Sequence, residues 1–479
     1  MSESGAAGRV LAIDVGTSIV KAAVVEPDGT VGDAVARPAE LHAGRDGVVE
    51  QRIEELTGAV LEVARRVIDT ADRPIDGIAI TGQGDGLWLR DAQGSPVRPA
   101  ISWMDSRAAA VLDEWDDGVA DELYRGTGSC LFPGSPPALL AWLDRHEPES
   151  LDRSAVAGRC VDAIAEQLTG AVVVDAASVS APFLDVRTRD YLDWVPEVCG
   201  FGHRRALLPE VAPPGANAPL LPRVASELGL AADTPVYAGP YDVVACQYGA
   251  GAHRTDAAVV VLGTTLSCQK LVDWPVAPVD GEPAGSYLCT PTPDRALRIM
   301  PSMVGTPAID WLHRLIGTRS DELDGLLRDS VAGAHGVTAL PFYSSAGERA
   351  PFVDSSVRAR FDGLELTSDR HDLMRALCEA IAFAARSCLA RLGEVDAVTG
   401  VGGGFRSRQL AQLFADVLQL PIMLPGVEQV GVRGAAVIAQ GLTDDPVPDG
   451  VVIEPDRRMA AQYEDAYARY LVTVDQARR

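Results

Sequence analysis

Two short segments place glycine and hydroxyl groups where a chain could turn around a phosphate. In the first, Asp14 precedes Gly16, Thr17 and Ser18, directly after an apolar run that ends at Ile13. Gly16 lets the backbone approach a polyanion closely, and the two hydroxyls and the turn N–H groups can donate to phosphate oxygens. Asp14 is placed to hold Mg²⁺, directly or through water. An ordinary hairpin explains the same residues, so this segment alone leaves both interpretations open.

The same pattern recurs half a chain later, where the apolar run 259–262 leads into Gly263, Thr264 and Thr265. Aligned on Gly-Thr, Val261 occupies the position of Asp14. The second copy can therefore cradle phosphate but cannot coordinate a metal. An internal duplication with a phosphate turn in each half predicts two similar domains that face a nucleotide in the cleft between them.

A third carboxylate, Asp242, follows the Gly239-Pro240 turn at the end of a short apolar segment. This position sets a carboxylate at the lip of a cleft. Phosphorylation of a hydroxyl needs a base near the attacking oxygen, in line with the γ-phosphate. The alternative is an exposed turn aspartate or a helix N-cap, but its place just before the second Gly-Thr turn favours a catalytic role.

Polar residues suited to a polyol lie between the first turn and Asp242. Gln83 and Asp85, separated by Gly84, can together donate to and accept from vicinal hydroxyls, and the glycines leave room for a substrate. Trp103 can lay its ring on the C–H side of a polyol while Asp105 takes hydroxyls. The alternatives are a plain tight turn at 83–86, and a core tryptophan beside a surface Asp105–Arg107 pair.

Composition excludes several other classes of protein. The 479 residues suffice for two or three domains, and the net charge of −25 disfavours nucleic acid and anionic membranes as partners. With only two lysines, Lys21 and Lys270, the chain has no Walker A loop, and the glycine run 400–404 lacks the last glycine of a Rossmann motif. Eight cysteines without a C-x-x-C pair, and a start without an apolar signal core, predict a reduced, cytoplasmic protein.

The elements that must position these residues follow from periodicity and capping. Strands are expected at 10–14, 21–25, 77–81, 86–90 and 236–239, and a loop at 209–222. Helices are expected near 50–70, 138–145, 163–168, 407–418 and 459–475, with a long amphipathic one from Asp369 to Arg391. Strands that alternate with helices predict an α/β fold. We divide the chain at 245/246, where small residues suit a hinge or an interface helix.

Taken together, these segments resemble the FGGY carbohydrate kinases of the actin-like superfamily, in the family's order and over nearly the whole chain. The resemblance rests on the hairpin 13–21, the stretch 81–107, the Asp242 segment, the second Gly-Thr turn, and Gly402-Gly403-Gly404. The segment 360–379 looks like a degenerate copy of the family's C-terminal signature. The resemblance implies two actin-like, ribonuclease-H-like domains around an interdomain cleft: 1–245 for substrate and 246–479 for nucleotide.

The resemblance also implies roles for single residues. ATP·Mg²⁺ would lie between the domains, with the metal near Asp14, and Asp242 would be the catalytic base. The acceptor would lie beside the polar residues between the two, namely Gln83, Gly84, Asp85, Trp103 and Asp105. The nucleotide would lie against both turns, Lys21 and the glycine run, that is Gly16, Thr17, Ser18, Lys21, Gly263, Thr264, Thr265, Gly402, Gly403, Gly404 and Arg406.

The resemblance narrows the range of acceptor substrates but does not identify a single one. The 82–86 segment with Trp88, and Tyr241-Asp242, look more like erythritol and L-xylulose-type kinases than glycerol kinases. We therefore expect a kinase of a small polyol, erythritol or another tetritol, with a pentulose or pentitol kinase, such as one for L-xylulose or L-ribulose, as the alternative. An actin-like ATP-binding regulator and a chaperone-type ATPase stay open as non-kinase alternatives. A homodimer is also possible.

Overall fold

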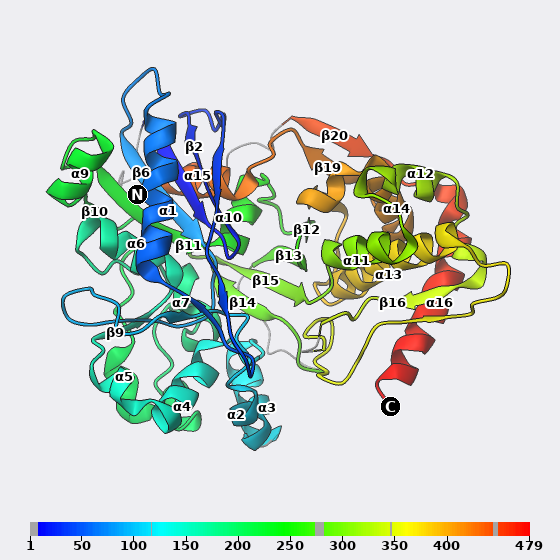
Figure 1. The fold of residues 1–479 in the computed structure, drawn as a ribbon, viewed down its shortest axis with the longest axis horizontal. Helices are drawn as coiled ribbons and strands as arrows, with labels where there is room; N and C mark the ends of the chain where they lie inside the picture. Colours follow the sequence, from blue (N-terminus) through cyan, green and yellow to red (C-terminus); the bar gives the residue numbers. More distant parts are fainter. Residues whose placement is uncertain (1–7, 116, 274–281, 345–346, 444–448) are drawn as a thin grey trace.

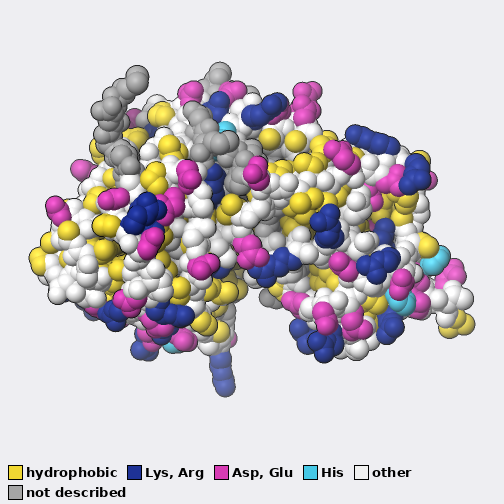
Figure 2. Space-filling model, turned by 90° about the horizontal axis from the view of Figure 1, so that it is seen from above, with side chains coloured by type: hydrophobic (Ala, Val, Ile, Leu, Met, Phe, Trp, Pro, Cys, Tyr) yellow, Lys and Arg dark blue, Asp and Glu magenta, His cyan; other side chains and the backbone are white. Residues whose placement is uncertain are grey.

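The computed structural model describes residues 8–115, 117–273, 282–344, 347–443 and 449–479. Figure 1 shows two lobes, with the first half of the chain in one and most of the second half in the other. Each lobe is built on one large mixed sheet. Acidic and basic side chains are interspersed over the face drawn in Figure 2. Within the described ranges, no helix combines the length and apolar character that crossing a membrane requires.

The first sheet has six strands in the order β10-β11-β6-β1-β2-β3. β1 pairs antiparallel with β2 and parallel with β6, and β6 pairs parallel with β11. The central strands are apolar on both faces, which is typical of a sheet covered by helices on each side. The bounds are β1 Val10–Val15, β2 Ile19–Val25, β3 Val35–Pro38, β6 Gly77–Gly82, β10 Asn217–Pro219 and β11 Pro235–Tyr241.

The second sheet repeats this plan with one extra edge strand, in the order β14-β15-β13-β12-β18-β19-β20. β12 pairs antiparallel with β13 and parallel with β18, which pairs parallel with β19, as β1, β2, β6 and β11 do in the first sheet. This agrees with the expected internal duplication. The bounds are β12 Ala257–Leu262, β13 Leu266–Asp273, β14 Ser286–Cys289, β15 Arg295–Ser302, β18 Ala397–Val401, β19 Ile422–Pro425 and β20 Gly450–Ile453.

Helices cover both faces of each sheet. In the first lobe, α1 and α6 pack on one face, together with α9. In the second lobe, α11, α13 and α14 pack on one face. The bounds are α1 Ile53–Ile68, α2 Ala109–Glu114, α3 Asp117–Thr127, α4 Pro136–His146, α5 Pro148–Asp152, α6 Cys160–Thr169, α7 Ala176–Phe183, α8 Trp194–Val198, α9 Pro222–Leu228, α11 Thr306–Ile316, α12 Leu323–Arg328, α13 Arg370–Ala390, α14 Arg408–Leu418 and α16 Ala460–Ala477.

Two helices cross between the lobes. α10 (Asp242–Gly249) follows β11 but packs on apolar residues of the second sheet, whereas α15 (Val430–Ala439) follows β19 but packs on β1, β2 and β6. Figure 1 shows α15, in orange, beside the blue strands of the first lobe. The helices touch through small residues: a methyl group at Gly434 would lie 1.8 Å from the Ala245 carbonyl oxygen. The two lobes are therefore joined through two exchanged helices.

Three small sheets complete the two lobes. In the first lobe, one sheet consists of β4 (His42–Ala43), β5 (Val49–Gln51) and β8 (Ala100–Ile101), and another pairs β7 (Trp88–Arg90) with β9 (Val156–Gly158). In the second lobe, β16 (Thr338–Leu340) pairs with β17 (Arg360–Asp362). The segment 209–222 was expected to be a loop because it is rich in proline, but it contains the short strand β10. All eight cysteines lie within the described ranges and are unpaired.

Candidate active site

The first phosphate turn ends the β1–β2 hairpin. The Gly16 N–H donates to the Ile19 carbonyl at 3.1 Å, and Asp14 lies opposite Lys21 and beside Thr81 in the sheet. The Asp14 Oδ1 atom is shielded from solvent and has no hydrogen-bond partner. Burial raises the pKa of Asp14 to about 6, although Lys21 offsets part of the shift. An unpartnered buried carboxylate oxygen suits a cation or a donor supplied by a ligand.

The second turn has the same hairpin plan but a helix behind it. The Gly263 N–H donates to the Thr265 carbonyl at 3.0 Å. The Gly263 carbonyl accepts from both the N–H and the hydroxyl of Thr306, the first residue of α11. The helix N-terminus, whose N–H groups favour anions, therefore begins directly against this turn. A methyl group at Gly263 would meet no atom within 4 Å, so its outer face is open.

Asp242 is the first residue of α10, at the point where β11 ends next to β6. Burial raises the pKa of Asp242 well above its usual range, and the charges of Asp14 and Asp85 add to the shift. The structure thus brings together three carboxylates that lie far apart in the sequence. A carboxylate with a raised pKa is a stronger proton acceptor than an exposed aspartate.

Asp85 is tied to Asp242 through the intervening tyrosine. The Tyr241 hydroxyl donates to Asp85 Oδ2 at 3.2 Å, and Asp85 holds a positive φ of 52°. A methyl group at Gly84 would lie 2.3 Å from the Tyr241 ring. We expected this glycine to leave room for the substrate, but the tyrosine ring takes that space. Gly84 therefore lets Tyr241 pack across the turn, and Asp85 faces the pocket.

Gln83 and Trp103 meet at the first phosphate turn. The Trp103 Nε1–H donates to the Thr17 hydroxyl at 2.8 Å, and that hydroxyl donates to Gln83 Oε1 at 3.2 Å. Gln83 is buried, and its amide donates to Gln51 Oε1 at 2.7 Å. The Thr17 hydroxyl proton, which we assigned to a phosphate, is thus already used. In this arrangement Thr17 joins the phosphate turn to the acceptor side.

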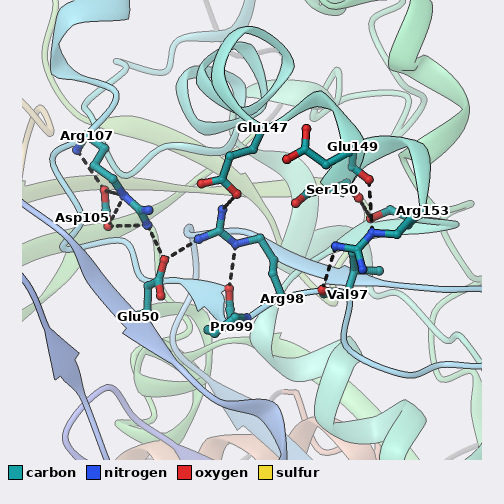
Figure 3. Close-up of polar contacts among 11 residues, drawn as sticks. Glu50, Val97, Arg98, Pro99, Asp105, Arg107, Glu147, Glu149, Ser150 and Arg153 are labelled. Atoms are coloured by element: carbon teal, nitrogen blue, oxygen red, sulfur yellow. Dashed lines mark hydrogen bonds and ion pairs between the residues drawn. The ribbon is translucent and has the colours of Figure 1, made fainter.

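Asp105 belongs to a buried ion-pair chain (Figure 3). Its carboxylate accepts from the Val49 N–H at 2.7 Å and from the Arg107 guanidinium. Arg107 also pairs with Glu50, which pairs with Arg98. Both Asp105 oxygens are therefore engaged by protein groups, and the chain braces the loop that carries Trp103. The structure contains the Asp105–Arg107 pair of the alternative interpretation, but Asp105 is buried and Arg107 is partly buried, so the pair is not on the surface.

Two arginines that the sequence did not single out lie near these residues: Arg349 lines the acceptor pocket, and the charge of Arg159 acts on Asp85. Arg349, from the second lobe, stacks its guanidinium 5.4 Å from the Trp103 ring centroid and 4.6 Å from that of Phe132. Arg159 lies before α6 and interacts electrostatically with Asp85. Their positions depend on packing between residues far apart in the sequence, so no local motif predicts them. The pocket is lined by residues of both halves, including Asp85, Phe132, Tyr241, Pro301 and Arg349.

The glycine run 402–404 lies at the end of β18, beside the second turn. Gly402 has a φ of 98°, and a methyl group there would lie 2.5 Å from the Leu262 carbonyl oxygen, so the turn requires glycine. Gly403, by contrast, is open. A pocket beside it is lined by Thr306, Asp310, Asp324, Gly404 and Arg406 among others. Arg406 is exposed and lies 3.6 Å from Glu428.

The chain matches known proteins along almost its entire length. Residues 9–249 match the model of the FGGY family of carbohydrate kinases, N-terminal domain, and residues 288–440 match that of the C-terminal domain. An erythritol kinase of Brucella abortus (strain 2308) is 30% identical over 96% of this chain and 95% of its own. A xylulose kinase of Bacillus subtilis (strain 168) is 26% identical over 90% and 87%. The crystal structure of a xylulose kinase from Rhodospirillum rubrum superposes with a TM-score of 0.85, at 26% identity, covering 98% of each chain.

Proposed function

The chain belongs to the FGGY family of carbohydrate kinases, and from this premise we propose that it phosphorylates a terminal hydroxyl of a tetritol such as erythritol. It is a carbohydrate kinase, so we set the ATP-binding regulator and the chaperone-type ATPase aside. The observation that carries the proposed chemistry is the half-buried Asp242 at the start of α10, next to Asp14 and Asp85. These carboxylates lie where the acceptor side meets the first phosphate turn.

ATP is the phosphoryl donor that family membership implies. Its phosphates would lie against the two turns, at Gly16-Thr17 and at Gly263-Thr264-Thr265. Asp242 takes the proton of the acceptor hydroxyl, while the hydroxyl oxygen forms a bond to the γ-phosphorus. The bond to the β,γ-bridging oxygen breaks, and ADP leaves with that electron pair. Closure of the lobes on α10 and α15 excludes water from the reacting groups.

Magnesium fits the residues present but needs the nucleotide to complete its shell. Within the described ranges, no cluster of three or more His, Cys, Asp or Glu side chains could hold a metal by itself. Asp14, with its unpartnered buried Oδ1, offers one carboxylate for the metal, and Asp242 is kept as the base. Mg²⁺ is commonly bound by one or two carboxylates together with phosphates and water. When bound, it would neutralise charge on the transferring phosphoryl group.

The acceptor pocket supports a small polyhydroxylated molecule. Asp85 and Tyr241 offer an acceptor and a hydroxyl, and Trp103 offers a ring edge beside the Arg349 stack. The similarity to an erythritol kinase over nearly the full length favours a tetritol. A ketopentose is the second candidate, because xylulose kinases are also similar over most of the chain. We further propose a cytoplasmic location, and a homodimer stays a prediction.

The test is coupled ADP release with ATP and Mg²⁺ across tetritols, pentitols, ketopentoses and glycerol. We expect a tetritol to give the highest kcat/KM. The Asp242→Asn variant should lose turnover by about 10³-fold or more, while ATP binding measured by calorimetry stays nearly unchanged. Preference for a ketopentose would replace the tetritol, and full turnover by Asp242→Asn would contradict the base assignment.

A further inference from the structure

Arg349 lines the acceptor pocket with a guanidinium that the protein uses only in part. The side chain is half-buried and shares the wall of the pocket with Asp85 and Tyr241. Its Nε–H donates to the Pro301 carbonyl at 3.0 Å. Among the residues that the structure describes, Nη1 and Nη2 of Arg349 have no hydrogen-bond partner, and both atoms are accessible to solvent. The donors of both terminal nitrogens are therefore left for a ligand or for solvent.

Two aromatic rings of the first lobe hold this guanidinium in place. It lies 5.4 Å from the Trp103 ring centroid and 4.6 Å from that of Phe132. An aromatic face attracts a cation at such distances. Phe132 itself lines the pocket, and the Trp103 Nε1–H is bonded to Thr17 of the first phosphate turn. The guanidinium is therefore pre-organised at the wall of the pocket, which lowers the entropy that a ligand must overcome to bind it.

The backbone of Arg349 is fixed to the segment that supports the second phosphate turn. The buried Glu348 carboxylate accepts from the Arg349 N–H at 2.8 Å. The same carboxylate accepts from the Met303 N–H and from the Ser302 hydroxyl, both at 2.8 Å. Ser302 pairs in the sheet with Leu266, the residue that follows the second turn. Arg349 is thus tied to the second turn, although its guanidinium lies among residues of the first lobe.

Asp85 offers the complementary chemistry in the same pocket. Its Oδ2 accepts from the Tyr241 hydroxyl at 3.2 Å, and its Oδ1 has no hydrogen-bond partner within the described residues. Burial raises the pKa of Asp85, and the positive charge of Arg349 offsets part of this shift. A hydroxyl group can donate to a carboxylate and also accept from a guanidinium. The pocket therefore suits a molecule with several hydroxyl groups.

We propose that Arg349 determines acceptor specificity, by donating from its terminal nitrogens to one acceptor oxygen other than the oxygen that is phosphorylated. This inference rests on the proposed kinase function and extends it by naming a residue of the second lobe that recognises the acceptor. A charge-assisted hydrogen bond is stronger than a neutral one. A site built to bond an oxygen discriminates strongly against a compound that lacks that oxygen.

The test is a cycle between protein and substrate. The wild type and Arg349→Met, which keeps an unbranched side chain between the rings but removes the donors, are compared on the best acceptor of the panel. Both are also assayed on deoxy analogues that each lack one of the oxygens that are not phosphorylated. We expect the wild type to lose about 10- to 100-fold in kcat/KM on one analogue, and Arg349→Met to lose a similar factor on the full acceptor.

The two losses should not multiply. On that one analogue, Arg349→Met should lose less than about threefold relative to its own activity on the full acceptor, because the donor for the missing oxygen is already gone. The penalties on the other analogues should persist in the variant. The affinity for ATP, measured by calorimetry without an acceptor, should stay unchanged.

A purely structural role for Arg349 predicts a different result. Every deoxy penalty would then be the same in the wild type and in Arg349→Met, and that outcome overturns the proposal. Thermal denaturation checks folding, and Arg349→Lys, which keeps the charge but lacks the paired terminal nitrogens, should weaken the same single penalty if Arg349→Met is unstable. Arg386→Met is the matched control. Arg386 belongs to the same lobe and stacks 4.3 Å from the Tyr467 ring centroid, but it is not among the residues that line the acceptor pocket, so this variant should keep every penalty.

The cycle also separates this proposal from the proposed substrate. If a ketopentose or pentitol is the best acceptor, the tetritol proposal fails, and the cycle is run on that acceptor and its own deoxy analogues to decide the role of Arg349. If no panel member raises either ADP release or the melting temperature of the wild type, both the proposed substrate and the role of Arg349 are overturned.

Discussion

The two Gly-Thr turns share a backbone plan and differ in what they can hold. Each ends a hairpin whose first strand pairs parallel with a third strand, β6 in one lobe and β18 in the other. Asp14 in the first turn is replaced by Val261 in the second. The last strand pair before the turn is Val15↔Val20 in the first hairpin and Leu262↔Leu266 in the second, so the second turn is one residue shorter. The two hairpins therefore share their backbone geometry, but only the first has a charged residue at this position.

The two turns also differ in the residues that surround them. Thr17 is bonded to Trp103 and Gln83, so the first turn is connected to the acceptor side. The second turn is backed by the N-terminus of α11, and Thr264 is exposed. The comparison suggests a division of work: the first turn aligns metal and acceptor with the phosphate, and the second holds the nucleotide phosphates.

Removing the charge that distinguishes the turns should have the largest effect. Asp14→Asn keeps the shape of the first turn and makes it as uncharged as the second. We expect kcat to fall by about 10³-fold, because a carboxylate at the reacting phosphate is lost. Steady-state kinetics at several Mg²⁺ concentrations measures this. Val261→Ala is the control at the equivalent position and should retain kcat within a few-fold; wild-type activity in Asp14→Asn would remove the proposed asymmetry.

The same substitution should stabilise the protein when metal and nucleotide are absent. Burial raises the pKa of Asp14 from 3.8 to about 6, so the native state binds its proton more tightly than the unfolded chain does. This contribution favours folding below about pH 4 and is lost as the pH rises to about 6. At pH 8 the ionised group costs up to about 3 kcal/mol, which Asp14→Asn removes.

Denaturant unfolding in EDTA measures this difference. The stability gain of Asp14→Asn over the wild type should be largest at pH 8 and shrink toward pH 4. A gain that is equal at both pH values would mean that the asparagine stabilises the turn by another route, such as a new hydrogen bond.

What the sequence could predict follows from how local each feature is. The strands expected at 10–14 and 77–81 depend on neighbouring residues, and each is found with its end one residue later. The helices expected from Asp369 and from Ser407 are also found, with these two residues as their N-caps. α13 was expected to be amphipathic, yet residues 376–385 are all buried, because other helices surround it. The exchange of α10 and α15, the ring of Tyr241 on Gly84, and Arg159 and Arg349 depend on tertiary packing, which no local pattern encodes.

Matched threonine substitutions should separate the two turns by substrate. Thr17→Val leaves the Trp103 and Gln83 side chains without their partner, so the KM for the acceptor should rise about tenfold with little change in the KM for ATP. Thr264→Val removes an exposed hydroxyl beside the second turn and should act mainly on the KM for ATP. Steady-state kinetics with each substrate varied in turn measures this; equal effects of both variants on both substrates would contradict the division of work.

Glycine-to-alanine substitutions should give the smallest effects. They test whether the glycine is required for the hairpin in the first turn and for the nucleotide in the second. A methyl group at Gly16 would lie 2.8 Å from the Ile19 carbonyl oxygen, which the hairpin cannot easily move, whereas one at Gly263 would meet open space. Gly16→Ala should therefore lower the free energy of unfolding by about 1–2 kcal/mol. Gly263→Ala should leave that free energy unchanged but raise the KM for ATP several-fold, because the added methyl group occupies the face toward the phosphates. Denaturation curves and ATP titrations of both variants measure these effects. If Gly263→Ala instead destabilises the fold and leaves ATP binding intact, the second turn serves the hairpin and not the nucleotide, and the comparison between the two turns loses its functional meaning.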